Sequence, residues 1–155
     1  MAGFLGEYEV TLDAKGRFLL PAGLKNQMEE NVDKRFVIKR GFEECLNLFT
    51  WEGWQKISMA ISELSPFDDE VREFTRIFLN GATITELDTA GRLLIPPGLK
   101  AYAELKKDIM VTANVDALEI WDKEKHTKLF EGLTKNRLRD MANKFLGNRS
   151  RISPN

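Results

Sequence analysis

The first residues of the chain alternate between apolar and polar side chains. Residues 8–12 read Tyr-Glu-Val-Thr-Leu, the two-residue period of a strand with one buried face. Residues 18–20 form a second apolar run, which ends at Pro21. Between the two runs, Asp-Ala-Lys-Gly at residues 13–16 suits a type I turn with its glycine in the left-handed conformation. The pattern predicts a β-hairpin, followed after Pro21 by a short helix over residues 24–30.

The same pattern returns later in the chain. Residues 13–25 and 88–100 are identical at eight of thirteen positions, and three of the remaining pairs stay small or apolar. The chain is therefore a tandem duplication, and a surface presented in two copies favours recognition over a single catalytic cleft. The other elements expected on this basis are a strand over 82–87, a short helix over 99–107, and strands over 36–39 and 46–49 that correspond to 109–112 and 118–121.

After each set of strands the apolar spacing changes to that of an amphipathic helix. Two helices are expected after the first set of strands: one has Trp54, Ile57, Ile61 and Leu64 on its apolar face, and the next has Phe67, Val71, Phe74 and Phe78. Two more are expected after the second set: one over residues 122–132, and one that Thr134 caps and that has Leu138, Met141 and Phe145 on its apolar face. These apolar stripes predict core or subunit contacts. Each copy thus predicts strands followed by two helices, which places the chain in the α+β class. We expect a first repeat over residues 1–80, a second over 81–147 and a basic, flexible tail over 148–155.

Composition narrows the possible functions. The chain has 155 residues, a formal net charge of −1, one cysteine and one histidine, so the sequence offers no internal disulfide and no Cys/His zinc site. We expect Cys45 to pack inside a strand and His126 to lie on a solvated helix. Neither a signal sequence nor a long apolar run is evident, so we expect no export and no membrane span. Without a phosphate loop or a nucleophile motif, we expect no enzyme, cofactor or metal.

Basic residues gather towards the C-terminal end. Residues 123–151 contain nine Lys/Arg and three Asp/Glu. Two interpretations stay open for this segment: a solvated amphipathic helix with a ragged end, or a contribution to binding phosphate or a partner.

The duplicated turn carries the candidate chemistry. In the first copy, Asp13 and Arg17 lie four residues apart, on either side of Lys15 and Gly16. We expect Asp13 and Gly16 to hold the turn and to brace the arginine. A guanidinium restrained in this way still offers free donors to phosphate, or to guanine O6 and N7.

The second copy repeats this arrangement with less charge. Asp88, Gly91 and Arg92 correspond to the aspartate, glycine and arginine of the first turn, while Ala90 stands in place of the lysine. We expect Asp88 and Gly91 to brace this turn. The first turn offers more positive charge than the second.

The doubled motif has the form Asp-x-x-x-Arg, three apolar residues, Pro, one residue and Gly-Leu-Lys. It resembles MraZ, a family of bacterial transcriptional regulators related to the AbrB swapped-hairpin proteins, over about residues 3–145. The resemblance implies two tandem AbrB-like swapped-hairpin units that intertwine into a pseudo-dimer within one chain. It also implies that chains assemble into homo-oligomeric rings.

The resemblance further implies binding of double-stranded DNA, at short repeated sequences ahead of the division and cell-wall gene cluster that encodes the protein. Such a regulator acts in the cytoplasm, in association with the nucleoid. By motif, the expected DNA-binding residues are Lys15, Arg17 and Arg92, and we expect the first turn to dominate the contact. In a ring, several weak turns gain affinity by avidity across repeated boxes.

Two alternatives stay open. In the first, the ring and its basic C-terminal helices bind another protein, for example an enzyme encoded nearby, and the Asp13/Arg17 pair is merely structural. In the second, the chain is an AbrB-like antitoxin, which would need a toxin-binding tail; the residues after Phe145 are few for that role.

Overall fold

The computed structural model describes residues 4–28 and 33–147, so the tail predicted over 148–155 lies outside the described residues. Contacts divide the chain into two compact units, residues 1–123 and residues 124–155. In the described ranges, the first unit contains the strands and four of the helices. The division into repeats at residues 80 and 81 stays a prediction about the sequence.

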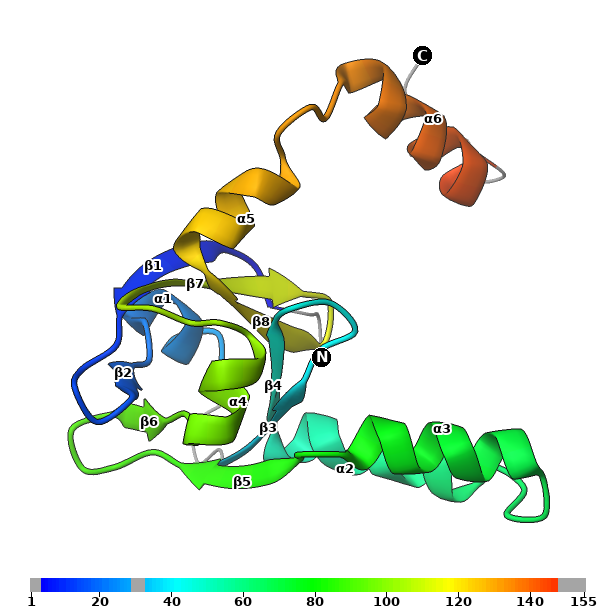
Figure 1. Ribbon diagram of the computed structural model, residues 1–155, viewed down its shortest axis with the longest axis horizontal. Coiled ribbons are helices and arrows are strands. Elements are labelled where there is room, and N and C mark those ends of the chain that lie inside the picture. The colour runs from blue at the N-terminus through cyan, green and yellow to red at the C-terminus, as the bar shows by residue number, and fades with distance from the viewer. Residues whose placement is uncertain (1–3, 29–32, 148–155) are drawn as a thin grey trace. The chain divides into compact units, whose positions relative to one another are not determined.

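The described strands of the first unit form two sheets (Figure 1). They are β1 (Glu7–Thr11), β2 (Arg17–Leu19), β3 (Arg35–Arg40), β4 (Leu46–Thr50), β5 (Thr83–Glu86), β6 (Arg92–Leu94), β7 (Asp108–Asn114) and β8 (Ala117–Asp122). Six of them make an antiparallel sheet in the order β1-β7-β8-β4-β3-β5. The remaining two, β2 and β6, form a separate antiparallel pair, which we call the ribbon.

Both sheets are built from strands of the two repeats. β1 pairs with β7, β5 with β3, and β2 with β6. The first turn is closed by a hydrogen bond from Asp13 N to Arg17 O at 2.8 Å, yet β1 and β2 then pair with different strands. The self-paired hairpin that the local pattern predicts is therefore wrong, and the swapped-hairpin pseudo-dimer is confirmed.

The register of the strands reveals a pseudo-two-fold axis. In the ribbon, Phe18 faces Leu93, and these two residues occupy the same position of the repeat. In the large sheet, Asn47 faces Glu119 at the centre of the β4–β8 pair, and these positions also correspond. Exchanging the strands of one repeat for those of the other reverses the order of the six-stranded sheet and leaves it otherwise unchanged. The axis therefore passes through both pairs.

The hydrophobic core draws on corresponding residues of both repeats. Its buried members include Phe18 and Leu93, Leu20 and Ile95, Leu24 and Leu99, Phe36 and Ile109, and Leu48 and Ile120. Because the same core is filled from both copies, neither repeat buries its apolar face alone. The two copies form one folding unit.

Two short helices follow the ribbon strands. α1 (Ala22–Lys25) and α4 (Pro97–Tyr102) are both shorter than the helices expected over 24–30 and 99–107. α4 ends early because Glu104 takes a positive φ of 52°, and Leu105 N donates back to Lys100 O in a Schellman-type closure. Residues 29 and 30 of the first expected helix lie outside the described residues.

Two longer helices, α2 (Trp51–Ser62) and α3 (Asp69–Leu79), follow the strands β3 and β4 of the first repeat. The Thr50 hydroxyl caps α2 and the Asp68 carboxylate caps α3. They pack through aromatic rings, with Trp54 stacked on Phe78 at 6.3 Å between centroids. Phe67, predicted on the apolar stripe, lies before α3 and is 90% exposed.

The second unit contains α6 (Lys135–Leu146), which the Thr134 hydroxyl caps as predicted. α5 (Lys123–Leu129) precedes it. His126 is buried, with its ring edge-on to Phe130 at 5.2 Å, so the expectation of a solvated histidine is wrong. None of the helices in the described ranges has the length and apolar character that crossing a membrane requires.

The paired residues at the centre of the ribbon should control stability. We expect Phe18→Ala to lower the free energy of unfolding by about 3–5 kcal/mol, because the side chain is 1% exposed and its removal leaves a cavity at the axis. Leu19→Ala, one residue on but facing solvent, should change it by less than about 0.5 kcal/mol. Urea unfolding followed by tryptophan fluorescence measures both. Equal losses from the two variants would contradict a core centred on the ribbon.

Candidate nucleic-acid interface

The first turn is held by one carboxylate. Asp13 Oδ1 accepts hydrogen bonds from the backbone N–H groups of Lys15 and Arg17, both at 2.9 Å, and Oδ2 accepts from Arg17 Nε at 2.9 Å. Gly16 N donates to Asp13 O at 3.0 Å, and Gly16 has a φ of 80°. A residue with a Cβ would be strained at that φ, and its Cβ would stand 3.3 Å from Ile95 O. The aspartate therefore fixes both the turn and the direction of the arginine.

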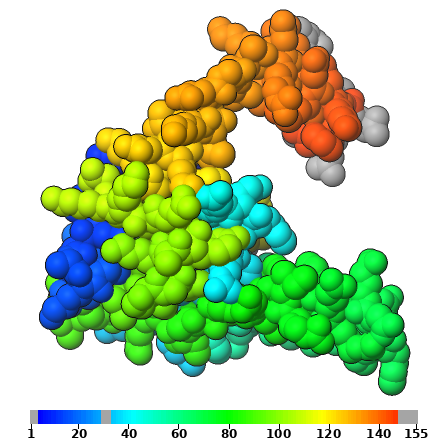
Figure 2. All heavy atoms as spheres, viewed as in Figure 1, coloured from blue at the N-terminus to red at the C-terminus, as the bar shows by residue number. Residues whose placement is uncertain are grey.

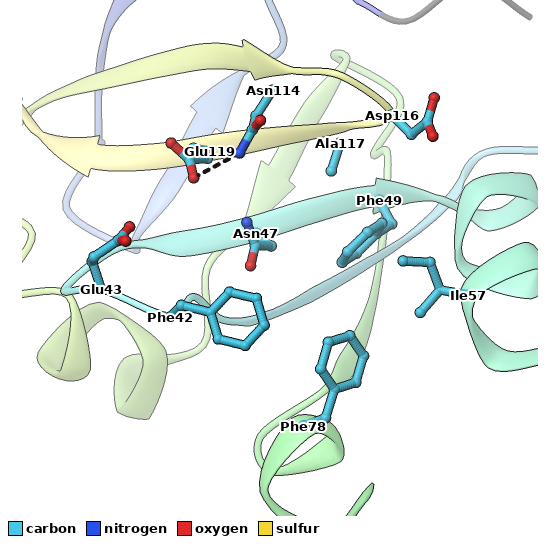
Figure 3. Close-up of a pocket in the computed structure, with 10 residues that line it drawn as sticks. All are labelled: Phe42, Glu43, Asn47, Phe49, Ile57, Phe78, Asn114, Asp116, Ala117 and Glu119. Carbon is cyan, nitrogen blue, oxygen red and sulfur yellow. Dashed lines mark hydrogen bonds between the residues drawn. The ribbon is translucent and has the colours of Figure 1, made fainter. Parts of the chain in front are cut away.

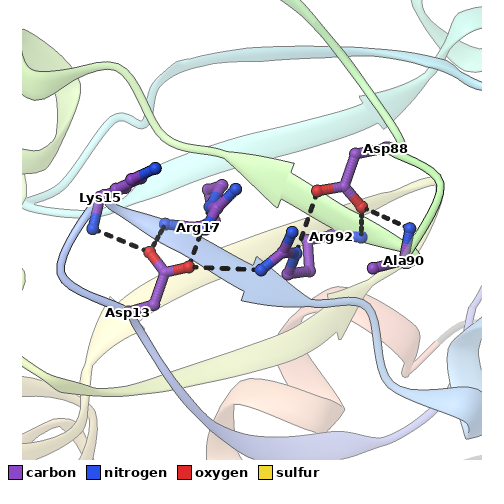
Figure 4. A network of polar contacts seen from close by, with 6 residues as sticks. All are labelled: Asp13, Lys15, Arg17, Asp88, Ala90 and Arg92. Carbon is purple, nitrogen blue, oxygen red and sulfur yellow. Dashed lines mark hydrogen bonds and ion pairs between the residues drawn. The ribbon is translucent and has the colours of Figure 1, made fainter.

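The second turn has almost the same geometry. Asp88 Oδ1 accepts from Ala90 N at 2.9 Å and from Arg92 N at 2.8 Å, while Oδ2 accepts from Arg92 Nε at 3.0 Å. Gly91 has a φ of 81°. Figure 4 shows the two clusters along the ribbon, each aspartate turned towards its own arginine. The seven residues predicted for the site thus lie at two turns joined by one pair of strands.

Each turn is also fastened to the other repeat. Ile95 N donates to Gly16 O at 2.9 Å, and Leu20 N donates to Gly91 O at 3.1 Å. In addition, Arg92 Nη1 lies 3.9 Å from Asp13 Oδ2, so the two aspartate–arginine pairs form one connected network. The sequence alone carries no signal for this cross-repeat contact, because it depends on the register of β2 against β6.

Hydrogen bonding lowers the pKa of both aspartates. The pKa of Asp13 is lowered from its ordinary value of 3.8, first by the Arg17 backbone N–H and then by the Arg17 side chain, while partial burial opposes the shift. The Arg92 backbone N–H lowers the pKa of Asp88 in the same way. Because both folded-state pKa values are depressed, the carboxylates stabilise the turns above pH 3.8, and this support is lost as the pH falls through the lowered values.

The two turns differ in the cations that they leave available. Among the described residues, the Arg17 side chain donates a hydrogen bond only through Nε, so its two Nη groups keep their donors. Lys15 is exposed and has no ion-pair partner in the described part of the chain. Arg92, by contrast, lies near two carboxylates, at 3.0 and 3.9 Å. The first turn therefore presents more uncompensated positive charge than the second.

The outer face of the ribbon contains two residues that sequence reasoning missed. Leu19 is 58% exposed and Leu94 is 46% exposed, while their neighbours Phe18 and Leu93 are buried. Because alternate residues of a strand share a face, the charged Arg17 could have placed Leu19 on the outward face, but the apolar run over residues 18–20 hides this signal. In the space-filling view, blue atoms of the first repeat and green atoms of the second lie side by side on this edge of the first unit (Figure 2).

Metal-ligand side chains gather at a different place. Oxygen and sulfur atoms of Glu43, Cys45 and Glu119 lie within 4.8 Å of one another. Burial raises the pKa of the Cys45 thiol to about 12, so the thiol stays protonated at neutral pH. The two carboxylate oxygens of Glu119 accept hydrogen bonds from Asn114 Nδ2 and Trp121 Nε1, each at 3.0 Å. A neutral thiol and an engaged carboxylate make a poor cation site.

A cavity of about 220 Å³ opens beside this group (Figure 3). Phe42, Phe49 and Phe78 form its apolar wall, and Glu119 with its partner Asn114 lies at the polar side. Lys39 lies over the Phe78 ring, with Nζ 4.2 Å from the ring centroid. The Glu119 carboxylate and the Lys39 ammonium thus already have partners within the protein.

Comparison with known proteins matches both copies of the repeat to one protein family. Residues 3–77 and 78–148 each match the family model described as "MraZ protein, putative antitoxin-like". The "Transcriptional regulator MraZ" of Christiangramia forsetii is 36% identical over 149 residues, which cover 96% of each chain. The protein of the same name from Cytophaga hutchinsonii is 42% identical over 128 residues, covering 83% of this chain and 85% of the relative.

Among solved structures, "The solution structure of PHS018 from pyrococcus horikoshii" aligns with a TM-score of 0.30 and 15% identity, over 75% of this chain and 86% of that one. A TM-score that low carries no argument about the fold. The family matches span nearly the whole chain and divide it into the two copies that interlock in the structure. The chain therefore belongs to the MraZ family.

Proposed function

We propose that this chain is a sequence-specific DNA-binding transcriptional regulator. The observation that carries the proposal is the pair of aspartate-braced arginines on one exposed two-stranded ribbon. A two-stranded ribbon fits the major groove of B-DNA, where guanine presents the O6 and N7 acceptors that a guanidinium can address. The names of the curated relatives point in the same direction.

In this proposal the first turn dominates the contact with DNA. Arg17 specifies guanine with its Nη donors, and Lys15 positions the ribbon on phosphate. Arg92 plays a smaller part because two carboxylates already compensate its charge. The targets are short repeated boxes upstream of the division and cell-wall gene cluster that encodes the chain. A regulator of this kind works in the cytoplasm, in association with the nucleoid.

We also propose that copies of the chain assemble into a ring. Exposed apolar side chains on and between α2 and α3 support self-association, among them Met59, Phe67 and Ile77, which are 65%, 90% and 66% exposed. A ring displays several first turns at once, so a weak contact at each turn becomes strong binding across repeated boxes. The rival proposal is a ring that binds a protein partner and does not read DNA.

Replacing Arg17 tests the proposal against this rival. We expect the wild type to prefer a duplex from the region upstream of its own coding sequence over a scrambled duplex, and Arg17→Ala to abolish the preference. Arg92→Ala should weaken binding less. Fluorescence anisotropy across a salt series measures these affinities, with size and folding of each variant checked separately. Equal, weak binding to both duplexes that Arg17→Ala leaves unchanged would favour the protein-binding module.

Lys15 should act on affinity and leave specificity unchanged. If the ammonium neutralises a phosphate, Lys15→Ala weakens binding to upstream and scrambled duplexes by a similar factor and lowers the salt slope by about one per bound turn. Lys25→Ala provides a matched loss of charge away from the turn. A selective loss for the upstream duplex alone would instead place Lys15 on a base.

Asp13 should act through the turn. We expect Asp13→Ala to lower DNA affinity although it removes a negative charge, because Arg17 and two backbone N–H groups lose their acceptor. Asp13→Asn keeps one oxygen for the backbone N–H groups and should retain more affinity. The same anisotropy titrations measure both variants. Wild-type affinity in Asp13→Ala, with an unchanged salt slope, would rule out a bracing role.

A further inference from the structure

The outward-facing leucines of the ribbon occupy the same position in the two repeats. Leu19 and Leu94 correspond, and both are leucine, whereas the neighbouring core positions differ: Phe18 corresponds to Leu93, and Leu20 to Ile95. The leucine side chains are 58% and 46% exposed. A single exposed leucine is ordinary on a protein surface. Here the chain presents two, related by the pseudo-two-fold axis, on the surface that carries both arginines.

The register of the ribbon places each leucine beside the arginine of the other repeat. Leu94 lies directly opposite Arg17, and Leu19 lies directly opposite Arg92. Alternate residues of a strand share a face, so all four side chains leave the same side of the ribbon. Each arginine therefore has an apolar neighbour that comes from the other copy.

Each leucine lies next to a turn glycine, which has no side chain that could shield it from solvent. Leu94 Cδ1 lies about 4.0 Å from the place where a Cβ would stand on Gly16, and Leu19 Cδ1 about 3.8 Å from the corresponding place on Gly91. Each leucine thus borders the turn of the opposite repeat, within reach of whatever that turn binds. At the first turn, Lys15 and Arg17 of one repeat and Leu94 of the other therefore form one surface.

We propose that Leu94 and Leu19 contact the 5-methyl groups of thymines next to the bases that the arginines address. The inference rests on the proposed function, since it deepens the same site. In the major groove, guanine presents two acceptors and thymine presents a methyl group, and apolar side chains recognise that methyl. A guanidinium with free donors beside an exposed leucine is complementary to a guanine with a neighbouring thymine. Reading DNA then requires both repeats at each turn.

Replacing thymine by deoxyuridine tests this inference, because the exchange removes only the 5-methyl group and keeps base pairing. The probe is the duplex from upstream of the chain's own coding sequence, prepared with thymine or with deoxyuridine. We expect the wild type to bind the deoxyuridine duplex about fourfold more weakly for each methyl that loses its contact. Leu19→Ala/Leu94→Ala should bind the thymine duplex more weakly and should lose most of its sensitivity to the exchange.

Leu5→Ala serves as the matched control, because Leu5 is 76% exposed and lies outside the ribbon. It should keep the full sensitivity to deoxyuridine. Any effect of the exchange on DNA stiffness would weaken all of the proteins alike, so the difference between variants isolates the methyl contact. Circular dichroism and size-exclusion chromatography check that the variants keep their fold and assembly.

Two results of the deoxyuridine exchange would overturn the inference. One is equal affinity of the wild type for both duplexes; the other is the same loss on deoxyuridine exchange in the double leucine variant as in the wild type. If Arg17-dependent preference for the upstream duplex persists in either case, the proposed function stands and only the role of the leucines fails. If the wild type does not prefer the upstream duplex over the scrambled one, both fail. A change in assembly size caused by the leucine variants alone would assign the leucines to a contact between copies.

Discussion

The pairing of β2 with β6 is the contact on which the first unit depends. It joins corresponding residues, Phe18 and Leu93, at the pseudo-two-fold axis, and it holds each turn to the other repeat through Gly16 O and Gly91 O. The outer strands of the large sheet are exchanged around the same axis. Neither copy can bury its apolar face without its counterpart, so folding and the formation of the candidate site are one event.

Each braced arginine has a fixed side-chain orientation, and its positive charge is largely compensated by an aspartate. Each aspartate orients its arginine by Nε and the backbone, which reduces the side-chain entropy that binding would otherwise lose. The same aspartate cancels most of the arginine's charge, so long-range attraction to DNA is modest. Lys15 restores some positive charge at the first turn only. A site built in this way favours geometric selection of a partner, and its affinity must come from several copies acting together.

Much of the fold follows from local pattern and from the repeat. Residues close in sequence predict the strand β1, the capped helices α3 and α6, and the left-handed glycines of the turns. The exchange of strands is not, because the pattern around Asp13 is equally that of an ordinary hairpin; only the family resemblance implied it. The Arg92–Asp13 contact and the position of each leucine opposite the arginine of the other repeat depend on the register between distant segments, which periodicity does not encode.

A structure of the protein bound to the duplex from upstream of its own coding sequence tests the central claim most directly. The account predicts that the β2–β6 ribbon lies in the major groove, with the Nη groups of Arg17 on guanine and Lys15 near phosphate. A complex in which the ribbon faces solvent and another surface, such as the Lys/Arg-rich helix α6, holds the DNA would contradict it.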